Sequence, residues 1–217
     1  MKKIISPSIL SADFGHLQSV CEMINRSEAE WIHIDVMDGL FVPNISFAFP
    51  VMKAIRAHCT KMMDVHLMIE HPENYITRFK EAGAGNITFH FETVGNPFAV
   101  IEQIKKEGIT AGITVNPDVP VEVLEPFIKE VDMVLLMTVF AGYGGQQYIE
   151  ESDERIRKVR AMIQKHHPSC LLEVDGGIHL QNVAKVYQCG ANVIVAGSSI
   201  FNAADQIGAI HDLLFAH

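Results

Sequence analysis

The sequence of 217 residues lacks several features that would assign it to a membrane or to nucleic acid. No apolar run approaches the roughly 18 residues of a membrane-spanning helix. The first residues, M-K-K-I-I-S-P-S-I-L-S-A-D, lack the long apolar centre of a signal peptide. Positive charge is scarce, because 17 Lys and Arg stand against 26 Asp and Glu, giving a formal net charge of -9. We therefore expect a soluble, cytoplasmic protein with neither a membrane nor nucleic acid as partner.

Cysteine is also rare, and its spacing argues against cysteine-based sites. The four cysteines are far apart and form no C-x-x-C pair; they are Cys21, Cys59, Cys170 and Cys189. This spacing favours reduced, structural thiols over a disulfide or a zinc knuckle. No G-x-G-x-x-G follows the first apolar run, so the fingerprint of a dinucleotide-binding sheet is missing.

The chain instead contains a regular alternation of short apolar runs and amphipathic stretches, repeated at intervals of roughly 25 to 30 residues. The expected strands are residues 3–10, 31–38, 62–68, 86–92, 110–116, 133–139, 171–175 and 193–197. Helical periodicity fills the gaps, for example at 97–107 and 153–166. No linker or low-complexity tract interrupts the series. We predict an α/β fold, a single (β/α)₈ TIM-barrel domain over residues 1–217, rather than an open doubly wound sheet.

Charged and polar residues occur inside three of these expected strands. The second contains W-I-H-I-D-V-M-D-G, in which His33 and Asp35 are two apart and therefore share a face. Asp64 and His66 repeat this arrangement on the third strand, and Asp175 ends the seventh. Buried carboxylates are costly unless they are paired or bound to a metal. Because catalytic groups of such barrels lie at the C-terminal rim, we predict a site for a divalent metal there.

Each of these residues also has an ordinary structural explanation. A single strand histidine is commonly a hydrogen-bonded core residue. Asp38 precedes a glycine at a strand end, which is typical of a turn. Asp64 lies deeper than His66 and is expected to orient a ligand. His90 and Glu92 on the fourth strand either line the site or have structural roles.

Three methionines, Met37, Met68 and Met137, lie at the C-terminal ends of expected strands. Flexible apolar side chains at this position could seal a bound substrate from water. Filling of the core is the alternative explanation for all three.

Three glycine-rich segments follow later strands. D-G-G at 175–177 and A-G-S-S at 196–199 come after strands seven and eight, where barrels commonly hold a phosphate on backbone N–H groups. Simple turns are the alternative. A-G-Y-G-G-Q-Q at 141–147 is suited to a lid that folds over a ligand. The candidate substrate-binding residues in these segments are Gly142, Gly144, Gly145, Gly176, Gly177, Gly197 and Ser198.

The motifs S-P-S-I-L-S-A-D, H-I-D-V-M-D-G-x-F-V-P-N, D-V-H-L-M, E-V-D-G-G and A-G-S-S-I-F together resemble the ribulose-phosphate 3-epimerase family. The resemblance runs almost end to end. It implies a barrel of the ribulose-phosphate-binding type that interconverts D-ribulose 5-phosphate and D-xylulose 5-phosphate in the pentose phosphate pathway. It also implies one divalent metal ion (zinc, iron, manganese or cobalt) and a homo-oligomer, either a dimer or a hexamer.

The resemblance assigns roles to individual residues. The metal ligands would be His33, Asp35, His66 and Asp175. Asp35 would accept a proton and Asp175 would donate one on the opposite face, while Ser8 and His66 would lie at the substrate. Gly177, Gly197 and Ser198 would hold its phosphate. This division agrees with the chemistry, because inverting a carbon next to a carbonyl requires proton removal from one face and return to the other.

The sequence departs from the family pattern at three places. Phe140 and Ala141 replace an acidic residue or Asn and a proline before the lid, Leu40 replaces a histidine, and S-F-A-F-P replaces a Gly-Pro-like segment. These changes leave open a 3-epimerase of a related phosphoketose, such as D-allulose 6-phosphate, or a non-catalytic sugar-phosphate-binding barrel. A lyase is a further alternative, but the D-x-K-x-x-D of such barrels is missing and the lysines avoid every strand C-terminus.

Overall fold

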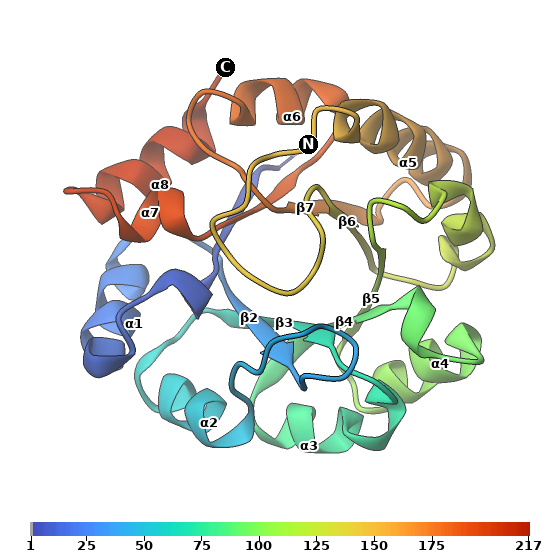
Figure 1. Ribbon diagram of the computed structural model, residues 1–217, viewed down its shortest axis with the longest axis horizontal. Coiled ribbons are helices and arrows are strands. Elements are labelled where there is room, and N and C mark those ends of the chain that lie inside the picture. Colours follow the sequence, from blue (N-terminus) through green and yellow to red (C-terminus); the bar gives the residue numbers. More distant parts are fainter. Residues whose placement is uncertain (1) are drawn as a thin grey trace.

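Eight parallel strands run side by side in the order β1-β8-β7-β6-β5-β4-β3-β2 and curve into a barrel that helices surround (Figure 1). The computed structural model describes residues 2–217. The strands are β1 (Ile4–Pro7), β2 (Trp31–Met37), β3 (Met62–Met68), β4 (Ala84–His90), β5 (Thr110–Val115), β6 (Met133–Met137), β7 (Leu171–Asp175) and β8 (Val193–Ala196). The predicted (β/α)₈ barrel is thereby confirmed.

The first and last strands in this order, β1 and β2, meet through a single parallel bridge between Ser8 and His33. By contrast, β2 and β3 pair along seven residues in register, from Trp31 opposite Met62 to Met37 opposite Met68. The barrel therefore closes at the level of Ser8 and His33.

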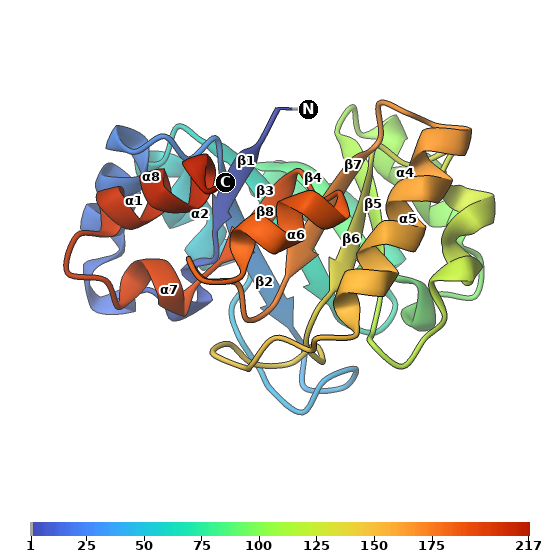
Figure 2. The same ribbon diagram turned by 90° about the horizontal axis from the view of Figure 1, so that it is seen from above.

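Helices cover the outside of the barrel (Figures 1 and 2). They are α1 (Leu17–Arg26), α2 (Phe49–His58), α3 (Ile76–Glu81), α4 (Pro97–Lys106), α5 (Ser152–His166), α6 (Val183–Cys189), α7 (Ser198–Phe201) and α8 (Gln206–Phe215). Short 3₁₀ segments are η1 (Ile9–Ser11), η2 (Phe14–His16), η3 (Pro72–Asn74), η4 (Phe91–Thr93) and η5 (Val121–Phe127). Within residues 2–217, no helix combines the length and the apolar character needed to cross a bilayer.

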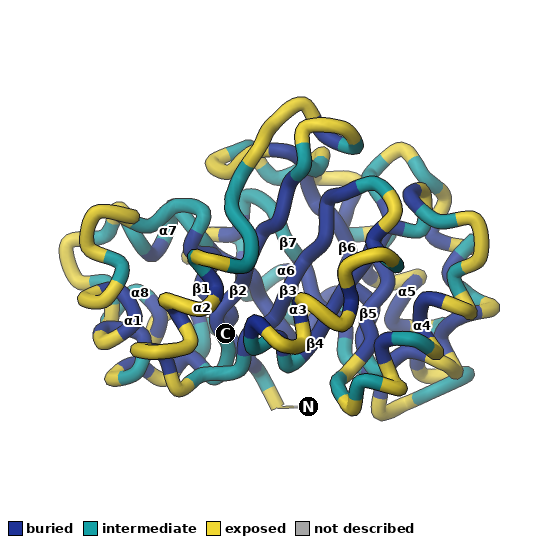
Figure 3. The backbone as a smooth tube through the Cα atoms, turned by 90° about the horizontal axis from the view of Figure 1, so that it is seen from below, coloured by how far each residue is buried: buried dark blue, intermediate teal, exposed yellow. Residues whose placement is uncertain are grey.

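The main hydrophobic core lies between the sheet and the surrounding helices. On β2, the alternate residues Ile32, Ile34 and Val36 belong to this core. The residues between them, His33 and Asp35, point into the barrel, because successive side chains of a strand face opposite sides. This alternation explains how a strand that is buried on both faces accommodates polar residues. Figure 3 shows that the strands are buried and that the loops beyond them are exposed.

Several boundaries differ from the sequence-based expectation. β1 ends at Pro7 because the chain turns into the 3₁₀ segment η1, although the apolar pattern continues. Between β5 and β6 the connection is the 3₁₀ segment η5, which contains Pro126. Proline removes a backbone donor and disfavours a regular α-helix there. β4 begins two residues earlier than expected and ends at His90, so Glu92 lies in η4.

Two loops project beyond the C-terminal ends of the strands and lie together over the barrel mouth (Figures 1 and 2). One joins β2 to α2, and the other joins β6 to α5. The Asn44 side chain of the first loop donates a hydrogen bond of 2.9 Å to the carbonyl of Gly142 in the second. The two loops therefore form one connected cover.

Candidate metal centre and substrate pocket

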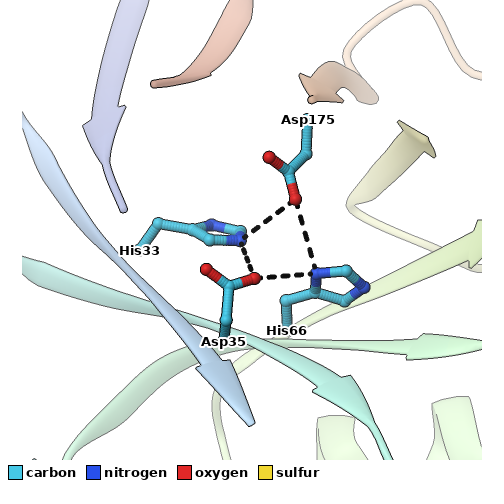
Figure 4. A group of neighbouring side chains, drawn as sticks. All are labelled: His33, Asp35, His66 and Asp175. Atoms are coloured by element: carbon cyan, nitrogen blue, oxygen red, sulfur yellow. Dashed lines mark hydrogen bonds and ion pairs between the residues drawn. The ribbon is translucent and has the colours of Figure 1, made fainter. Parts of the chain in front are cut away.

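Two histidines and two aspartates from three strands meet inside the C-terminal end of the barrel (Figure 4). His33 and Asp35 come from β2, and His66 comes from β3, where it pairs in register with Asp35. Asp175 is the last residue of β7. The structure thus brings together the four residues that the sequence singled out as candidate ligands.

The donor atoms of the four side chains form a closed ring. Asp35 Oδ1 lies 3.4 Å from His33 Nε2 and 3.3 Å from His66 Nδ1. Asp175 Oδ2 lies 4.0 Å and 3.7 Å from the same two nitrogens. Four atoms bonded to zinc at about 2.0–2.1 Å in a tetrahedron are about 3.3 Å apart. The observed spacing therefore fits four-coordinate binding of one divalent cation after a small contraction.

The hydrogen bonding around His33 supports this fit. Its Nδ1 lies 2.7 Å from Asp64 Oδ2, while its Nε2 is buried and has no hydrogen-bond partner. A proton on Nδ1 that is donated to Asp64 leaves the Nε2 lone pair facing the ring of donor atoms. Asp64 also accepts a hydrogen bond of 2.8 Å from Asn86. The arrangement presents an unused nitrogen donor to the centre.

Three carboxyl groups in this part of the barrel differ in their pKa values. Burial opposes ionisation of Asp35, but the charges and hydrogen bonds of His33 and His66 outweigh it and hold the Asp35 pKa well below its usual range. Burial and then the charge of Asp35 raise the pKa of Asp175 to about 7. Burial and then the charge of Asp64 raise the pKa of Glu173. A divalent cation would favour the ionised form of Asp175, because it adds positive charge at the same place.

A cavity open to solvent lies above the two aspartates. Ser8, Met37, Met68 and Met137 line it together with Asp35 and Asp175. It also contains the predicted glycine-rich residues, namely Gly142, Gly144, Gly145, Gly176, Gly177, Gly197 and Ser198. His33 and His66 lie below the cavity and are fully buried. The cavity is therefore a candidate substrate pocket with carboxylates at its floor.

Ser8 contacts one of the four candidate ligands, Asp35. Its hydroxyl donates a hydrogen bond of 2.5 Å to Asp35 Oδ2, the oxygen that does not face the two histidines. Ser8, the residue directly after β1, also forms the bridge with His33 that closes the barrel. Barrel closure and the orientation of Asp35 therefore depend on the same residue.

The glycines after β7 and β8 let other parts of the chain approach closely at the pocket wall. Gly177 has a φ of +66°, and a Cβ added there would lie 2.4 Å from the backbone nitrogen of Tyr148. A Cβ on Gly197 would lie 2.6 Å from the hydroxyl of Ser11. Among the turn and loop hydrogen bonds of residues 2–217, none is donated by the backbone of Gly177, Gly197 or Ser198. Gly177, Gly197 and Ser198 thus line the pocket with no turn or loop acceptor for their N–H groups among the described residues.

The segment expected to act as a lid is held in a defined loop. The Gln146 side chain donates to the carbonyls of Phe140, at 2.7 Å, and Tyr143, at 2.9 Å. The backbone N–H of Ala141 donates to the Asn116 side chain at 3.0 Å. Phe140 and Ala141 both line the pocket. Of the three departures from the family pattern, this one borders the candidate substrate.

The other two departures lie outside the substrate pocket. Leu40 is 77% exposed and borders a separate cavity with Phe49 and Tyr75. The S-F-A-F-P segment does not line the substrate pocket either. Asp38 has the turn role expected for it, since its side chain accepts from the backbone of Leu40 and also from that of Glu70.

Sequence reasoning missed several residues of the pocket region. Leu10 and Ser11 line the pocket from the loop after β1. All eight loops that follow the strands of a barrel can reach its site, so the position of Leu10 and Ser11 at the end of the first expected strand could have indicated them. Thr138 donates to the carbonyl of Asp175 from its hydroxyl and from its backbone, both at 2.8 Å. No sequence pattern indicates that contact, because it depends on how β6 and β7 are aligned.

Fold and site together define a (β/α)₈ barrel with a candidate divalent-metal centre at the C-terminal rim. Solved structures with distant sequences share the fold. One is a mutant tryptophan synthase alpha-subunit from Pyrococcus furiosus, with 17% identity, a TM-score of 0.72 and coverage of 99% of each chain. Orotidine 5'-phosphate decarboxylase from Pyrococcus horikoshii OT3 is similar as well (14% identity, TM-score 0.69, 97% of each chain).

The chain belongs to the ribulose-phosphate 3 epimerase family, whose model matches residues 4–201. It is 41% identical over 210 residues to a ribulose-phosphate 3-epimerase from Bacillus subtilis, covering 96% of this chain and 97% of the relative. It is 42% identical over 203 residues to a ribulose-phosphate 3-epimerase from Aquifex aeolicus, covering 94% and 91%. The family resemblance stated from the motifs is thereby confirmed.

Proposed function

We propose that the protein is a metal-dependent 3-epimerase that interconverts D-ribulose 5-phosphate and D-xylulose 5-phosphate. Family membership and the near full-length similarity to ribulose-phosphate 3-epimerases support an isomerase of this class. The observation that carries the proposal is the pair Asp35 and Asp175. These carboxylates come from β2 and β7, which β1 and β8 separate around the barrel, and they face one ring of donor atoms.

Two carboxylates on different sides of one carbon are what a 3-epimerase needs. Asp35 takes the C3 proton of one epimer, and Asp175 returns a proton to the other face; the reverse reaction exchanges the roles. The Ser8 hydroxyl donates to Asp35 Oδ2 and so holds the carboxylate with Oδ1 facing the two histidines. Three buried methionines at the pocket floor exclude water from that carbon; they are Met37, Met68 and Met137.

His33, Asp35, His66 and Asp175 would hold the divalent cation. When bound, such a cation supplies positive charge that stabilises the negative charge developing on the C2 oxygen. Two imidazole nitrogens and two carboxylate oxygens suit zinc, iron, manganese or cobalt alike. The donor set therefore supports a divalent metal as a class.

The substrate's phosphate would bind at the opposite end of the pocket. The backbone N–H groups of Gly177, Gly197 and Ser198 are the proposed donors, which lets a protein with a formal charge of -9 bind an anion without a surface of positive charge. The segment 141–147 would cover the sugar between the phosphate and the metal. Phe140 and Ala141 would then contact its chain and influence which phosphoketose is preferred.

Two further properties belong to the proposal. A reducing, cytoplasmic location agrees with four cysteines that are all buried and free. A homo-oligomer, a dimer or a hexamer, stays a prediction from the family resemblance, and light scattering coupled to gel filtration measures it.

The decisive experiment is incubation with D-ribulose 5-phosphate in D₂O, followed by NMR. We expect deuterium at C3 and the appearance of D-xylulose 5-phosphate. D-allulose 6-phosphate and unphosphorylated D-ribulose are run in parallel. Faster turnover of the allulose phosphate would reassign the substrate within the same chemistry. Binding of phosphoketoses without any C3 exchange would contradict the epimerase and favour a non-catalytic binder.

A further inference from the structure

His66 has a second buried imidazole on the side away from the candidate metal centre. Its Nδ1 faces Asp35 and Asp175, while its Nε2 lies 2.9 Å from Nε2 of His90. The two ring centroids are 5.1 Å apart and the ring planes differ by 24°. The rings therefore meet edge to edge and are nearly coplanar, which is the geometry of an in-plane N–H···N hydrogen bond.

His90 itself lies beside a carboxylate, that of Glu92. The His90 ring is fully buried, and the ring of Phe41 packs on it with a centroid distance of 4.7 Å. Its buried Nδ1 has no hydrogen-bond partner and lies 3.6 Å from Glu92 Oε2, at ion-pair separation. The other oxygen, Glu92 Oε1, accepts a hydrogen bond of 2.9 Å from the backbone N–H of Asn116. A line of polar groups thus runs from His66 through His90 and Glu92 to the end of β5.

The direction of the protons along this line follows from the role of His66. A neutral imidazole carries one proton, so a ring that offers the Nδ1 lone pair to a cation has its proton on Nε2. That proton can only be donated to His90 Nε2, which must then be an acceptor. The proton of His90 is consequently on Nδ1 and points to Glu92. One carboxylate therefore determines the tautomers of two histidines.

We propose that His90 and Glu92 are positioning residues that hold His66 as its Nε2–H tautomer and so strengthen metal binding at Nδ1. The inference rests on the proposed function, because it takes His66 as a metal ligand. His33 has the equivalent support in a single step, from Asp64 at 2.7 Å. Partners of this kind, which accept from the second nitrogen of a ligand histidine, contribute substantially to metal affinity.

Glu92→Gln tests the proposal directly. This substitution should reverse the direction of the hydrogen bonds between His66, His90 and residue 92, and it should not remove them. The backbone N–H of Asn116 still needs an acceptor, so we expect it to bind the amide oxygen of the substituted side chain. The NH₂ group of the amide then points toward His90. His90 Nδ1 then accepts and its Nε2 carries the proton. His66 must accept at Nε2 and therefore carries its own proton on Nδ1, the atom that would bind metal.

Two substitutions of His90 separate this role from core packing. His90→Phe keeps a planar ring but can neither accept from His66 nor donate to Glu92. His90→Gln offers an amide oxygen to His66 and an amide N–H to Glu92, and it preserves the direction of the line. The control is Glu125→Gln, which alters a His–Glu pair at the surface, where Glu125 accepts from His166 at 2.8 Å. Glu125 lies on η5 and does not border the pocket.

Zinc dissociation constants from chelator competition are the first measurement. We expect Glu92→Gln and His90→Phe to weaken binding by about 10- to 100-fold. His90→Gln and Glu125→Gln stay near the wild type. The second measurement is ¹⁵N NMR of the metal-free protein, in which His66 carries its proton on Nε2 in the wild type and on Nδ1 in Glu92→Gln. If His90→Phe does not fold, Glu92→Gln still provides both measurements, because the Glu92 side chain is 21% exposed and not part of the core.

The outcomes separate this inference from the proposed function. The positioning role alone would be overturned if His66→Ala lost zinc affinity while Glu92→Gln kept it. In that case His66 of metal-free Glu92→Gln would also keep its proton on Nε2. A wild-type protein that binds no divalent metal would overturn both. Weakened binding with equal loss in His90→Gln and His90→Phe would assign His90 to packing and reject the proton line.

Discussion

At the residue scale, the two central aspartates have different surroundings although they face the same atoms. Asp35 receives the Ser8 hydroxyl, and two histidines hold its pKa low. Asp175 is held chiefly through its backbone carbonyl, to which Thr138 donates twice, and its pKa is raised to about 7. Asp35 is thus the more firmly oriented carboxylate, and Asp175 is the more easily protonated one.

Asp175→Asn tests the assignment of the two faces. Because the amide cannot exchange protons as the carboxyl does, we expect epimerisation to fall by about 10²–10⁴-fold. Exchange of the C3 proton that faces Asp35 should decrease much less, without inversion. Asp35→Asn should show the reverse preference with the other epimer. NMR in D₂O, starting from each epimer separately, measures both.

This experiment needs a metal determination on every variant, since both aspartates are candidate ligands. Loss of metal would abolish exchange and inversion together and would be visible by atomic absorption. Metal-loaded variants that lose exchange equally from both epimers would point to a single base in place of two.

The central residues of the site were predictable from the sequence, whereas their supports were not. His33, Asp35, His66 and Asp175 stand out because polar residues interrupt apolar strands with a period of two. The contact of His90 with His66 depends on the stagger between β3 and β4, where the register shifts after Met63. A single sequence carries no signal for that shift.

At the scale of elements, the phosphate-binding proposal depends on the turn between β7 and α6. Its geometry requires glycine at position 177, given the positive φ and the close approach to Tyr148. Gly177→Ala should displace this turn at a cost of about 1–3 kcal/mol. Because 1.4 kcal/mol is a factor of ten, we expect kcat/KM for the phosphorylated ketose to fall about tenfold or more.

Gly95→Ala is the matched control, because a Cβ there meets nothing within 4 Å. Steady-state kinetics of both variants, with phosphorylated and unphosphorylated ketose, provide the comparison. Equal loss on both sugars for Gly177→Ala would argue against a role of this turn in phosphate binding.

Element boundaries were predictable where composition changes sharply. β3 and β7 begin and end at the residues expected from the sequence, Met62–Met68 and Leu171–Asp175. β1 ends earlier than expected, since Ile9 and Leu10 continue an apolar pattern that the structure uses in a 3₁₀ turn at the pocket. Tertiary packing decides such cases, and local propensity does not.

At the scale of the whole molecule, the barrel gathers three buried carboxyl groups, Asp35, Asp64 and Glu173, next to the partly exposed Asp175. Cation binding offsets the repulsion among them, so removal of metal should lower the stability of the fold. A ligand at 100 times its dissociation constant contributes about 2.7 kcal/mol. For a chain of this length, we expect chelation to lower Tm by about 5–10 °C.

Differential scanning calorimetry with and without chelator measures this shift, and re-addition of zinc should restore the original Tm. His66→Ala, which lacks a candidate ligand, should show little response to chelator. An unchanged wild-type Tm after verified metal removal would contradict a contribution of the metal to stability.

The single bridge between Ser8 and His33 makes β1 and β2 the seam at which the barrel closes. Ligand atoms lie on both sides of this seam, on β2 and β3 along one direction of the sheet and on β7 along the other. Local opening there separates the ligands, whereas opening between β4 and β5 does not. Metal loading should accordingly slow amide hydrogen exchange in β1 and β2 more than in β4 and β5. The catalytic centre would then also hold β1 and β2 together and so keep the barrel closed.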